Sequence, residues 1–243
     1  MINNIYELLR GNSYPGRGII FGRSEDGLRS IIAYFIMGRS ENSRNRLFER
    51  TADGIKTAAF DPSALVDPSL IIYHPLRRFY TETIVTNGDQ TDTIRGYLSQ
   101  GLDYRDALKT REFEPDRPNY TPRISGIMHS DGSYELSIIK AHNGDPSCCV
   151  RSFFEYSAAL PGLGHFLCTY SSDGEPLPSF EGEPVPVRIN AMNGASGFAE
   201  SIWQALNTSN KVSVYACETD ISTGEYLDHI INKNGNGREY DRV

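Results

Sequence analysis

Several features of membrane and secreted proteins are missing from this 243-residue sequence. It has no run of about 18 consecutive apolar residues, so no transmembrane helix is predicted. The first residues, MINNIYELLRGNSYPGRG, are too polar for a secretory signal peptide. The only cysteines, Cys148, Cys149, Cys168 and Cys217, have no CxxC spacing and indicate reduced thiols rather than a disulfide framework. We therefore expect a cytoplasmic protein without a membrane partner.

Common catalytic and cofactor signatures are also absent. The sequence contains no GxxxxGK[ST], GxGxxG, GxSxG or HExxH motif. Its five histidines lack the spacing of metal ligands; they are His74, His129, His142, His165 and His229. We therefore predict no metal ion and no redox cofactor.

The charges are unevenly distributed. The formal net charge of −7 argues against a general nucleic-acid-binding protein, which needs a basic surface. Residues 1–125 contain 17 basic and 16 acidic side chains, whereas residues 126–243 contain 7 and 15. Of the 24 basic residues 19 are arginine, and 15 of these lie at or before Arg123. Arginine presents a planar fork of donors that suits carboxylate and phosphate. The first half therefore predicts either ordinary surface ion pairs or an anion-binding site.

Hydrophobic patterning predicts a single α+β domain over residues 1–243, because strand hairpins and helices occur in separate blocks. The expected strands are 17–22, 29–37, 70–73, 82–86, 134–141, a strand around Phe153, 164–170 and 211–217. The expected helices are 3–10, 92–98, 103–111, 196–206 and 222–231. Residues 171–187, rich in Pro, Gly and Glu, are predicted to be an exposed loop, and residues 232–243 a flexible tail.

Four segments have the composition of functional sites. Residues 38–46 place three arginines directly after an apolar strand, where they can converge on an anion or lie in an ordinary surface loop. Residues 87–94 contain an Asn-Gly turn and helix-capping side chains, with Thr91 or Asp92 as the cap, and can also form an anion cradle. Residues 113–124 hold three prolines that keep carboxylates and guanidiniums on a rigid platform or in a structural crossover. Residues 73–75 place a tyrosine at the end of an apolar stretch.

In this order, the segments resemble the archaeal-type IMP cyclohydrolase family. The similarity covers about residues 14–127, and no single motif within it is specific. The matching residues are Gly16-Arg17, Gly22-Arg23, Ala33-Tyr34, Arg39-Ser40, Asn45-Arg46, Ile72-Tyr73, Asn87-Gly88, Thr91-Asp92-Thr93-Ile94, Glu114, Asp116 and Thr121-Pro122-Arg123-Ile124.

The resemblance implies a fold and a reaction. The fold is an Ntn-hydrolase-like four-layer α-β-β-α sandwich of two antiparallel sheets, without self-processing. The reaction is the dehydrative ring closure of 5-formamidoimidazole-4-carboxamide ribotide to IMP in purine biosynthesis, which needs no cofactor. The implied partners are this purine ribotide and its product, and the family implies a homo-oligomer.

The resemblance and the chemistry together assign expected roles. Glu114 transfers protons, Tyr73 donates to the developing oxyanion or relays the proton, and Arg46 stabilises charge. The substrate-binding candidates are Arg17, Arg39, Arg44, Asn87, Asp92 and Arg123. Of these, Arg17, Arg39 and Arg123 are expected to bind the phosphate or the carboxamide, and Asn87 and Asp92 to line the pocket or hold its loops. The segment from Arg39 to Arg46 is about two residues longer than the expected pattern, which leaves the choice between Arg44 and Arg46 open.

Two other functions stay open at this stage. One is a purine-ribotide-binding sensor or scaffold on the same fold that has lost cyclisation. The other is an Ntn-type amidohydrolase, whose nucleophile is a free N-terminal Cys, Ser or Thr. No cysteine lies in residues 1–147, so that reading needs cleavage before Ser13 within the N-terminal extension, residues 1–13.

Overall fold

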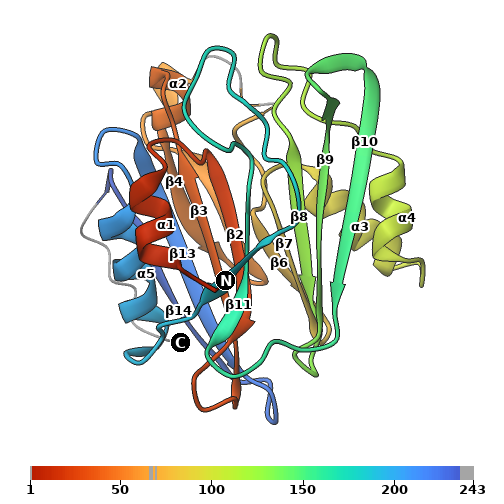
Figure 1. Cartoon of the computed structure of the whole chain (residues 1–243), viewed down its shortest axis with the longest axis vertical. Coiled ribbons are helices and arrows are strands. Elements are labelled where there is room, and N and C mark those ends of the chain that lie inside the picture. The colour runs from red at the N-terminus through yellow and green to blue at the C-terminus, as the bar shows by residue number, and fades with distance from the viewer. Residues whose placement is uncertain (1, 66–67, 69, 236–243) are drawn as a thin grey trace.

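Two seven-stranded sheets face each other in the computed structural model, which describes residues 2–65, 68 and 70–235 (Figure 1). The first sheet has the order β1 (Asn3–Asn4), β12 (Val185–Arg188), β11 (Leu163–Cys168), β2 (Arg17–Arg23), β3 (Arg29–Met37), β13 (Lys211–Asp220) and β14 (Tyr226–Asn232). The second has the order β10 (Asp145–Tyr156), β9 (Tyr134–His142), β8 (Arg123–Met128), β7 (Glu82–Thr86), β6 (Leu76–Phe79), β5 (Gly54–Ala59) and β4 (Arg46–Thr51).

Helices cover the outer faces of both sheets. On the left of Figure 1, α1 (Ile5–Gly11) and α5 (Gly194–Ala205) pack against the first sheet. On the right, α3 (Gln90–Leu98) and α4 (Tyr104–Lys109) pack against the second sheet. The short α2 (Glu41–Arg44) lies at the upper end, and a 3-10 turn spans Pro62–Ala64. No helix of the described residues is long and apolar enough to cross a membrane.

The central strand β3 shows that the first sheet is covered on both faces. Eight of its nine residues are buried, which is the pattern of a strand with no solvent-facing side. It pairs antiparallel with β2, where Tyr34 lies opposite Ile19, and with β13, where Tyr34 lies opposite Tyr215. The sequence 29–37 predicts these bounds correctly, because a continuous apolar run flanked by a turn and a polar loop leaves no competing pattern.

The two sheets approach closely at one point in the core. A Cβ atom on Gly126 of β8 would lie 2.7 Å from the ring of Phe21 on β2. The same ring packs edge-on against Tyr134 of β9, with 5.7 Å between ring centroids. Glycine at position 126 therefore allows a strand of one sheet to rest on an aromatic ring of the other.

The structure corrects several expectations. The first sheet is mixed rather than antiparallel, because β1 pairs parallel with β12. Residues 70–73 form a turn that is hydrogen-bonded to Thr57, and not a strand. Residues 222–231 form a turn and β14, and not a helix: Gly224, with φ +76°, closes a hairpin that pairs Tyr226 with Thr219. Helix α3 begins at Gln90 after Asp89, so neither Thr91 nor Asp92 is its cap.

The other differences between the predicted and the observed elements are smaller. Helix α5 begins after Asn193, three residues before the expected cap Ser196. In the predicted exposed loop, Leu177 and Phe180 are buried. The predicted tail starts at Asn232, which ends β14, and residues 236–243 lie outside the described residues.

Candidate active site

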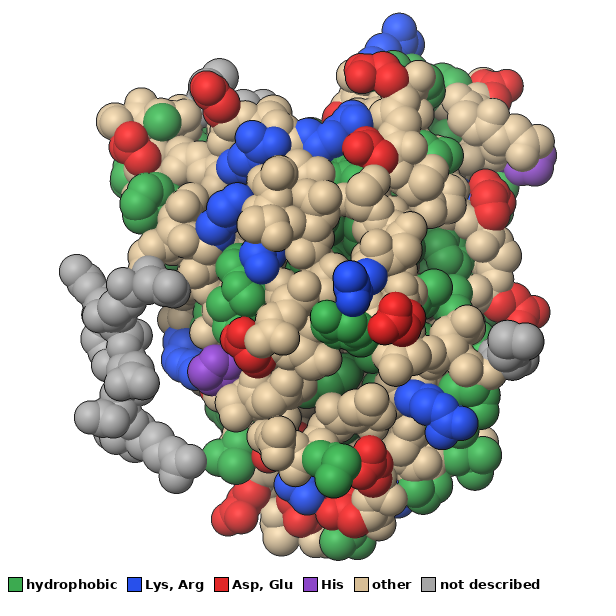
Figure 2. All heavy atoms as spheres, turned by 60° about the vertical axis from the view of Figure 1, so that its left-hand side comes forward, with side chains coloured by type: hydrophobic (Ala, Val, Ile, Leu, Met, Phe, Trp, Pro, Cys, Tyr) green, Lys and Arg blue, Asp and Glu red, His purple; other side chains and the backbone are tan. Residues whose placement is uncertain are grey.

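Charged side chains are buried together where the two sheets meet at the upper end of Figure 1. Here β2 and β4 begin, β3 ends, and the segment that carries Glu114 leads into β8. The strand alternation places Arg17 on the same face of β2 as Phe21, which is the face toward the second sheet. Figure 2 shows basic side chains gathered in the upper half of the molecule below a hollow in its upper edge.

The two arginines of this end are buried but incompletely paired. The Arg46 side chain is fully buried; its Nε donates to Ser43 O at 2.8 Å and its Nη2 to Met37 O at 3.3 Å. Within the described residues, Arg46 Nη1 and Arg17 Nε are buried and have no hydrogen-bond partner. Buried donors are nearly always paired in folded proteins. Two unpaired guanidinium donors at one end therefore indicate a place for an acceptor that is not part of the protein.

Glu114 is the carboxylate of this cluster and is only 2% exposed. Its backbone N–H donates to Thr121 O at 2.9 Å, which fixes the segment as a tight connection before β8. Within the described chain its carboxylate makes neither a hydrogen bond nor an ion pair with another group. The carboxylate is therefore held in place by its backbone and is free to bond to a ligand.

Burial controls the protonation of Glu114. It raises the pKa of the carboxyl to about 7, against the opposing charges of Arg17 and Arg123. Burial alone lowers the pKa of Arg17, but the Glu114 carboxylate contributes to a net rise above the ordinary value. Burial, followed by the charge of Arg17, lowers the pKa of Arg46. A carboxyl whose pKa lies near neutral pH, beside the guanidiniums of Arg17, Arg46 and Arg123, can both accept and release a proton.

Tyr73 is the third predicted catalytic residue, and the structure brings it to the same cluster. It is 5% exposed and its hydroxyl lies 2.9 Å from the hydroxyl of Tyr34 on β3. The Tyr73 backbone is tied to β5, because its N–H donates to Thr57 Oγ1 at 2.8 Å and its carbonyl accepts from Thr57 N at 2.8 Å. The cluster of Arg17, Arg46, Tyr73 and Glu114, with Tyr34 behind it, is called the buried cluster below.

Sequence reasoning missed a second network beside Glu114. Thr121 Oγ1 bonds both to Asp116 and to the hydroxyl of Tyr170, and the Asp116 carboxylate also accepts from Thr121 N. Tyr170 stacks on Tyr14 with 5.9 Å between ring centroids. Asp116 and Thr121 belong to the segment that the sequence singles out, but Tyr170 follows β11, and no local signal connects it to residue 121. This network closes the wall next to Glu114.

Two predicted binding residues have most of their polar side-chain atoms hydrogen-bonded within the protein. Arg123 Nε donates to Glu112 O at 2.8 Å, and its Nη1 donates to Asp89 and Gln90, both at 2.8 Å. Asn87 is fully buried, donates to Pro122 O at 2.9 Å and accepts from Ile124 N at 2.8 Å. Both side chains therefore brace the backbone on either side of the Glu114 segment.

Three other predicted residues lie outside the buried cluster. Arg39 pairs with Asp173 at 2.9 Å and lies over the ring of Tyr14. Arg44 donates to Gly38 O at 2.9 Å from α2, so Arg46, and not Arg44, belongs to the cluster. Asp92 is about half exposed on α3 and pairs with Arg77 at 2.8 Å.

The segment 171–184 crosses the upper end of both sheets, as Figure 1 shows in teal. Asp173 contacts Arg39 directly after the first sheet's β3. Phe180 O accepts from Lys140 Nζ of β9 in the second sheet at 2.8 Å. The segment therefore links the two sheets above the buried cluster.

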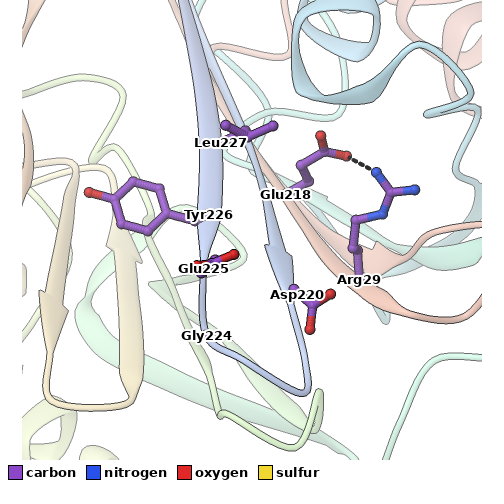
Figure 3. Close-up of a pocket in the computed structure, with 7 residues that line it drawn as sticks. All are labelled: Arg29, Glu218, Asp220, Gly224, Glu225, Tyr226 and Leu227. Atoms are coloured by element: carbon purple, nitrogen blue, oxygen red, sulfur yellow. Dashed lines mark hydrogen bonds and ion pairs between the residues drawn. The ribbon is translucent and has the colours of Figure 1, made fainter. Parts of the chain in front are cut away.

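A recess of about 570 Å³ lies at the opposite end, beside the β13–β14 hairpin (Figure 3). Arg29 and Glu218 form an ion pair across it at 3.0 Å, and Asp220, Glu225 and Tyr226 line it. It is shallow, its charged groups are paired or solvated, and it contains no predicted site residue. In the described ranges, no three His, Cys, Asp or Glu side chains gather as metal ligands. The recess therefore lies away from the buried cluster and shares no lining residue with it.

The fold and the buried cluster define an α+β protein that buries a carboxyl group and guanidinium groups together at one end of two facing sheets. The chain belongs to the family described as IMP cyclohydrolase-like protein, whose sequence model matches residues 14–224.

Curated relatives in archaea agree with this family. The IMP cyclohydrolase of Methanosphaera stadtmanae is 28% identical over 161 residues, which cover 65% of this chain and 73% of that protein. The IMP cyclohydrolase of Methanococcus maripaludis strain C5 is 32% identical over 128 residues, or 50% of this chain and 61% of that protein. The Halobacterium salinarum strain R1 enzyme of the same name is 30% identical over 132 residues, or 53% and 63%.

Proposed function

We propose that this protein catalyses the dehydrative ring closure of 5-formamidoimidazole-4-carboxamide ribotide to IMP. The observation that carries the proposal is the buried Glu114 carboxylate, which has no hydrogen bond from the described residues and lies beside two guanidiniums whose buried donors have no partner there either. We infer the particular reaction from membership of the IMP cyclohydrolase-like family. On this proposal the protein acts in purine biosynthesis and binds the ribotide and its product.

The reaction makes two demands. The carboxamide nitrogen is a poor nucleophile and must lose a proton as it attacks the formyl carbon. The formyl oxygen gains negative charge and then leaves as water, so it needs hydrogen-bond donors and two protons, which balance those lost by the carboxamide nitrogen and by the formamide N–H. Because both reacting groups belong to one molecule, orientation in the site and fixed dipoles can supply much of the acceleration.

Glu114 meets the demand for proton transfer. With a pKa of about 7, its carboxylate is present near neutral pH and can take the proton from the carboxamide nitrogen. The resulting carboxylic acid can return a proton to the departing oxygen. One residue thus serves as base and then as acid.

Arg46, Arg17 and Tyr73 meet the demand for charge stabilisation. Arg46 Nη1 and Arg17 Nε are buried donors without partners among the described residues, and the Tyr73 hydroxyl lies in the same cluster. We assign Arg46 and Tyr73 to the formyl oxygen, and Arg17 to an anionic group of the ribotide. Arg39 lies beside Tyr14 near the cluster and is proposed as a second contact for the phosphate.

The proposal includes the finer description of the fold. Two sheets between helical layers are the arrangement expected of an Ntn-hydrolase-like sandwich, here without self-processing. An intact-mass measurement on the purified protein tests this. A mass that shows cleavage before Ser13 would favour the amidohydrolase chemistry instead.

The test of function is an assay with purified protein and the formamido ribotide, with IMP followed by absorbance and identified by chromatography. We expect enzyme-dependent formation of IMP in proportion to protein concentration. Measurable IMP binding without turnover would contradict the proposal and favour a ribotide-binding sensor.

A further inference from the structure

The hydroxyls of Tyr34 and Tyr73 form a hydrogen bond between the two sheets. Their oxygens are 2.9 Å apart, and both side chains are buried. Tyr34 belongs to β3 at the centre of the first sheet, while Tyr73 is tied to β5 of the second sheet through Thr57. The distance between the phenols is therefore set by how the sheets dock.

Either hydroxyl can donate in this hydrogen bond, and the surroundings of Tyr34 suit it to donate when Tyr73 bonds to a substrate. Among the described residues, the Tyr34 hydroxyl has one hydrogen-bond partner, Tyr73, and the side chain is 0% exposed. Its pKa is raised well above the ordinary value by burial, so the phenol keeps its proton. If Tyr73 donates its proton to a substrate, its oxygen is free to accept from Tyr34. In that state each of the two hydroxyl protons forms a hydrogen bond: that of Tyr73 to the substrate and that of Tyr34 to Tyr73.

Such a chain strengthens the outer donor. A hydroxyl that accepts a hydrogen bond becomes a better donor, because hydrogen bonds in a chain polarise one another. The Tyr34 ring is held against Phe48 of β4 with 5.8 Å between centroids, so the inner donor does not need to be ordered when the substrate arrives.

We propose that Tyr34 is a positioning residue that donates to Tyr73 and thereby orients and strengthens the Tyr73 hydroxyl as a donor to the substrate oxygen on which negative charge develops. This proposal rests on the proposed function, since it concerns the oxygen of the formyl group. It assigns Tyr34 no contact with the substrate.

The experiment compares Tyr34→Phe, Tyr73→Phe and the double variant in the IMP-forming assay. We expect Tyr34→Phe to lower kcat about 10-fold and to change KM by less than about twofold, because the lost interaction matters most when charge develops. The double variant should be no slower than Tyr73→Phe, because Tyr34 acts only through Tyr73.

The matched control is Tyr104→Phe, which removes a buried hydroxyl bonded to Ser137 at 2.9 Å under the α3–α4 layer. Its kcat should stay within about twofold of the wild type.

A wild-type kcat in Tyr34→Phe would overturn this proposal, as would multiplicative losses in the double variant. If Tyr34→Phe does not fold, 3-fluorotyrosine at position 34 provides the test, because its more acidic phenol is a stronger donor. An unchanged or lower kcat would then overturn the proposal, and a higher kcat would support it. A wild-type protein that forms no IMP would overturn the proposed function itself, whereas an active wild type with an insensitive Tyr34 removes only the role of Tyr34.

Discussion

Burial of the Glu114 carboxylate makes folding less favourable, and the proposed role of this residue in the site accounts for its burial. A carboxylate removed from water is destabilising unless hydrogen bonds or ion pairs replace its hydration, and within the described residues Glu114 has neither. Arg17 and Arg123 lie near enough to limit the shift of its pKa but do not cancel the effect of burial. A side chain kept in this condition indicates a site arranged for a ligand.

The first prediction concerns pH and stability. The pKa of Glu114 is about 7 in the folded protein. In the unfolded chain it is close to the ordinary value of 4.5. Below the lower value both states are protonated; between the two values the unfolded state ionises first, so folding stability falls as pH rises to about 7. Glu114→Gln should therefore raise the free energy of unfolding by roughly 3 kcal/mol at about pH 8 and by much less at about pH 4.5.

Thermal unfolding at both pH values measures this difference. Glu112→Gln is the matched control, because Glu112 is two residues away and exposed. It should leave stability unchanged within about 0.5 kcal/mol at both pH values. Equal stability of Glu114→Gln and the wild type at the higher pH would contradict the burial argument.

The sequence could suggest the residues of the buried cluster but not their state. Arg46, Tyr73 and Glu114 follow from the ordered resemblance, and the structure gathers them with Arg17. Whether an arginine keeps an unpaired donor depends on acceptors far along the chain. Arg123 donates through Nε to Glu112 and through Nη1 to Asp89 and Gln90, so these two donors are not available to a ligand.

At the scale of elements, the connection from β7 into α3 supports the Glu114 segment. Asn87 makes three buried hydrogen bonds, to Pro122 O, from Ile124 N and from Gln90. These bonds hold the turn after β7 against the start of β8, which follows the Glu114 segment. The turn after β7 thereby positions the start of β8, next to the segment that carries Glu114.

The second prediction tests this brace. Asn87→Ala should lower the free energy of unfolding by about 2–4 kcal/mol, because it leaves buried backbone groups without partners. Asp92→Ala, five residues later, removes a half-exposed pair with Arg77 and should cost less than about 0.5 kcal/mol. Denaturant titration of both variants measures the difference, and similar values would argue against the brace.

Which elements were predictable depends on whether local pattern and tertiary pairing agree. Strands β3 and β7 follow from their apolar patterns, and the structure confirms 29–37 and 82–86. Residues 222–231 have helical spacing, but the Gly224 turn and pairing with β13 make 226–232 a strand. The parallel β1–β12 pair joins residues more than 180 positions apart, which no local pattern reveals.

At the scale of the whole molecule, the buried cluster exists only because the two sheets dock. Arg17 and Tyr34 come from the first sheet, whereas Arg46 begins β4 of the second, and Tyr73 and Glu114 lie in segments tied to the second sheet. All five come from the Arg-rich first half of the sequence. The acidic second half contributes four strands and α5 to the first sheet's side, two complete strands to the second sheet, and the segment 171–184 above the cluster.

The third prediction concerns this docking. Gly126→Ala places a Cβ 2.7 Å from the Phe21 ring and should lower the free energy of unfolding by about 1–3 kcal/mol, because a buried ring must shift. Gly96→Ala is the control, since no atom lies within 4 Å of a Cβ there and the site is inside α3. It should stabilise the protein by about 0.5–1 kcal/mol. Opposite signs in thermal unfolding support the close contact of the sheets, and a neutral Gly126→Ala would contradict it.

The central claim is that Glu114 transfers protons during ring closure, and its most direct test is kcat for IMP formation by Glu114→Gln at saturating ribotide. The amide keeps the shape of the carboxyl but cannot accept the proton, so kcat should fall by at least about 100-fold. The Kd for IMP, measured on the same preparation, should stay within about threefold of the wild type. A near-wild-type kcat in this variant would contradict the claim and remove Glu114 from the mechanism.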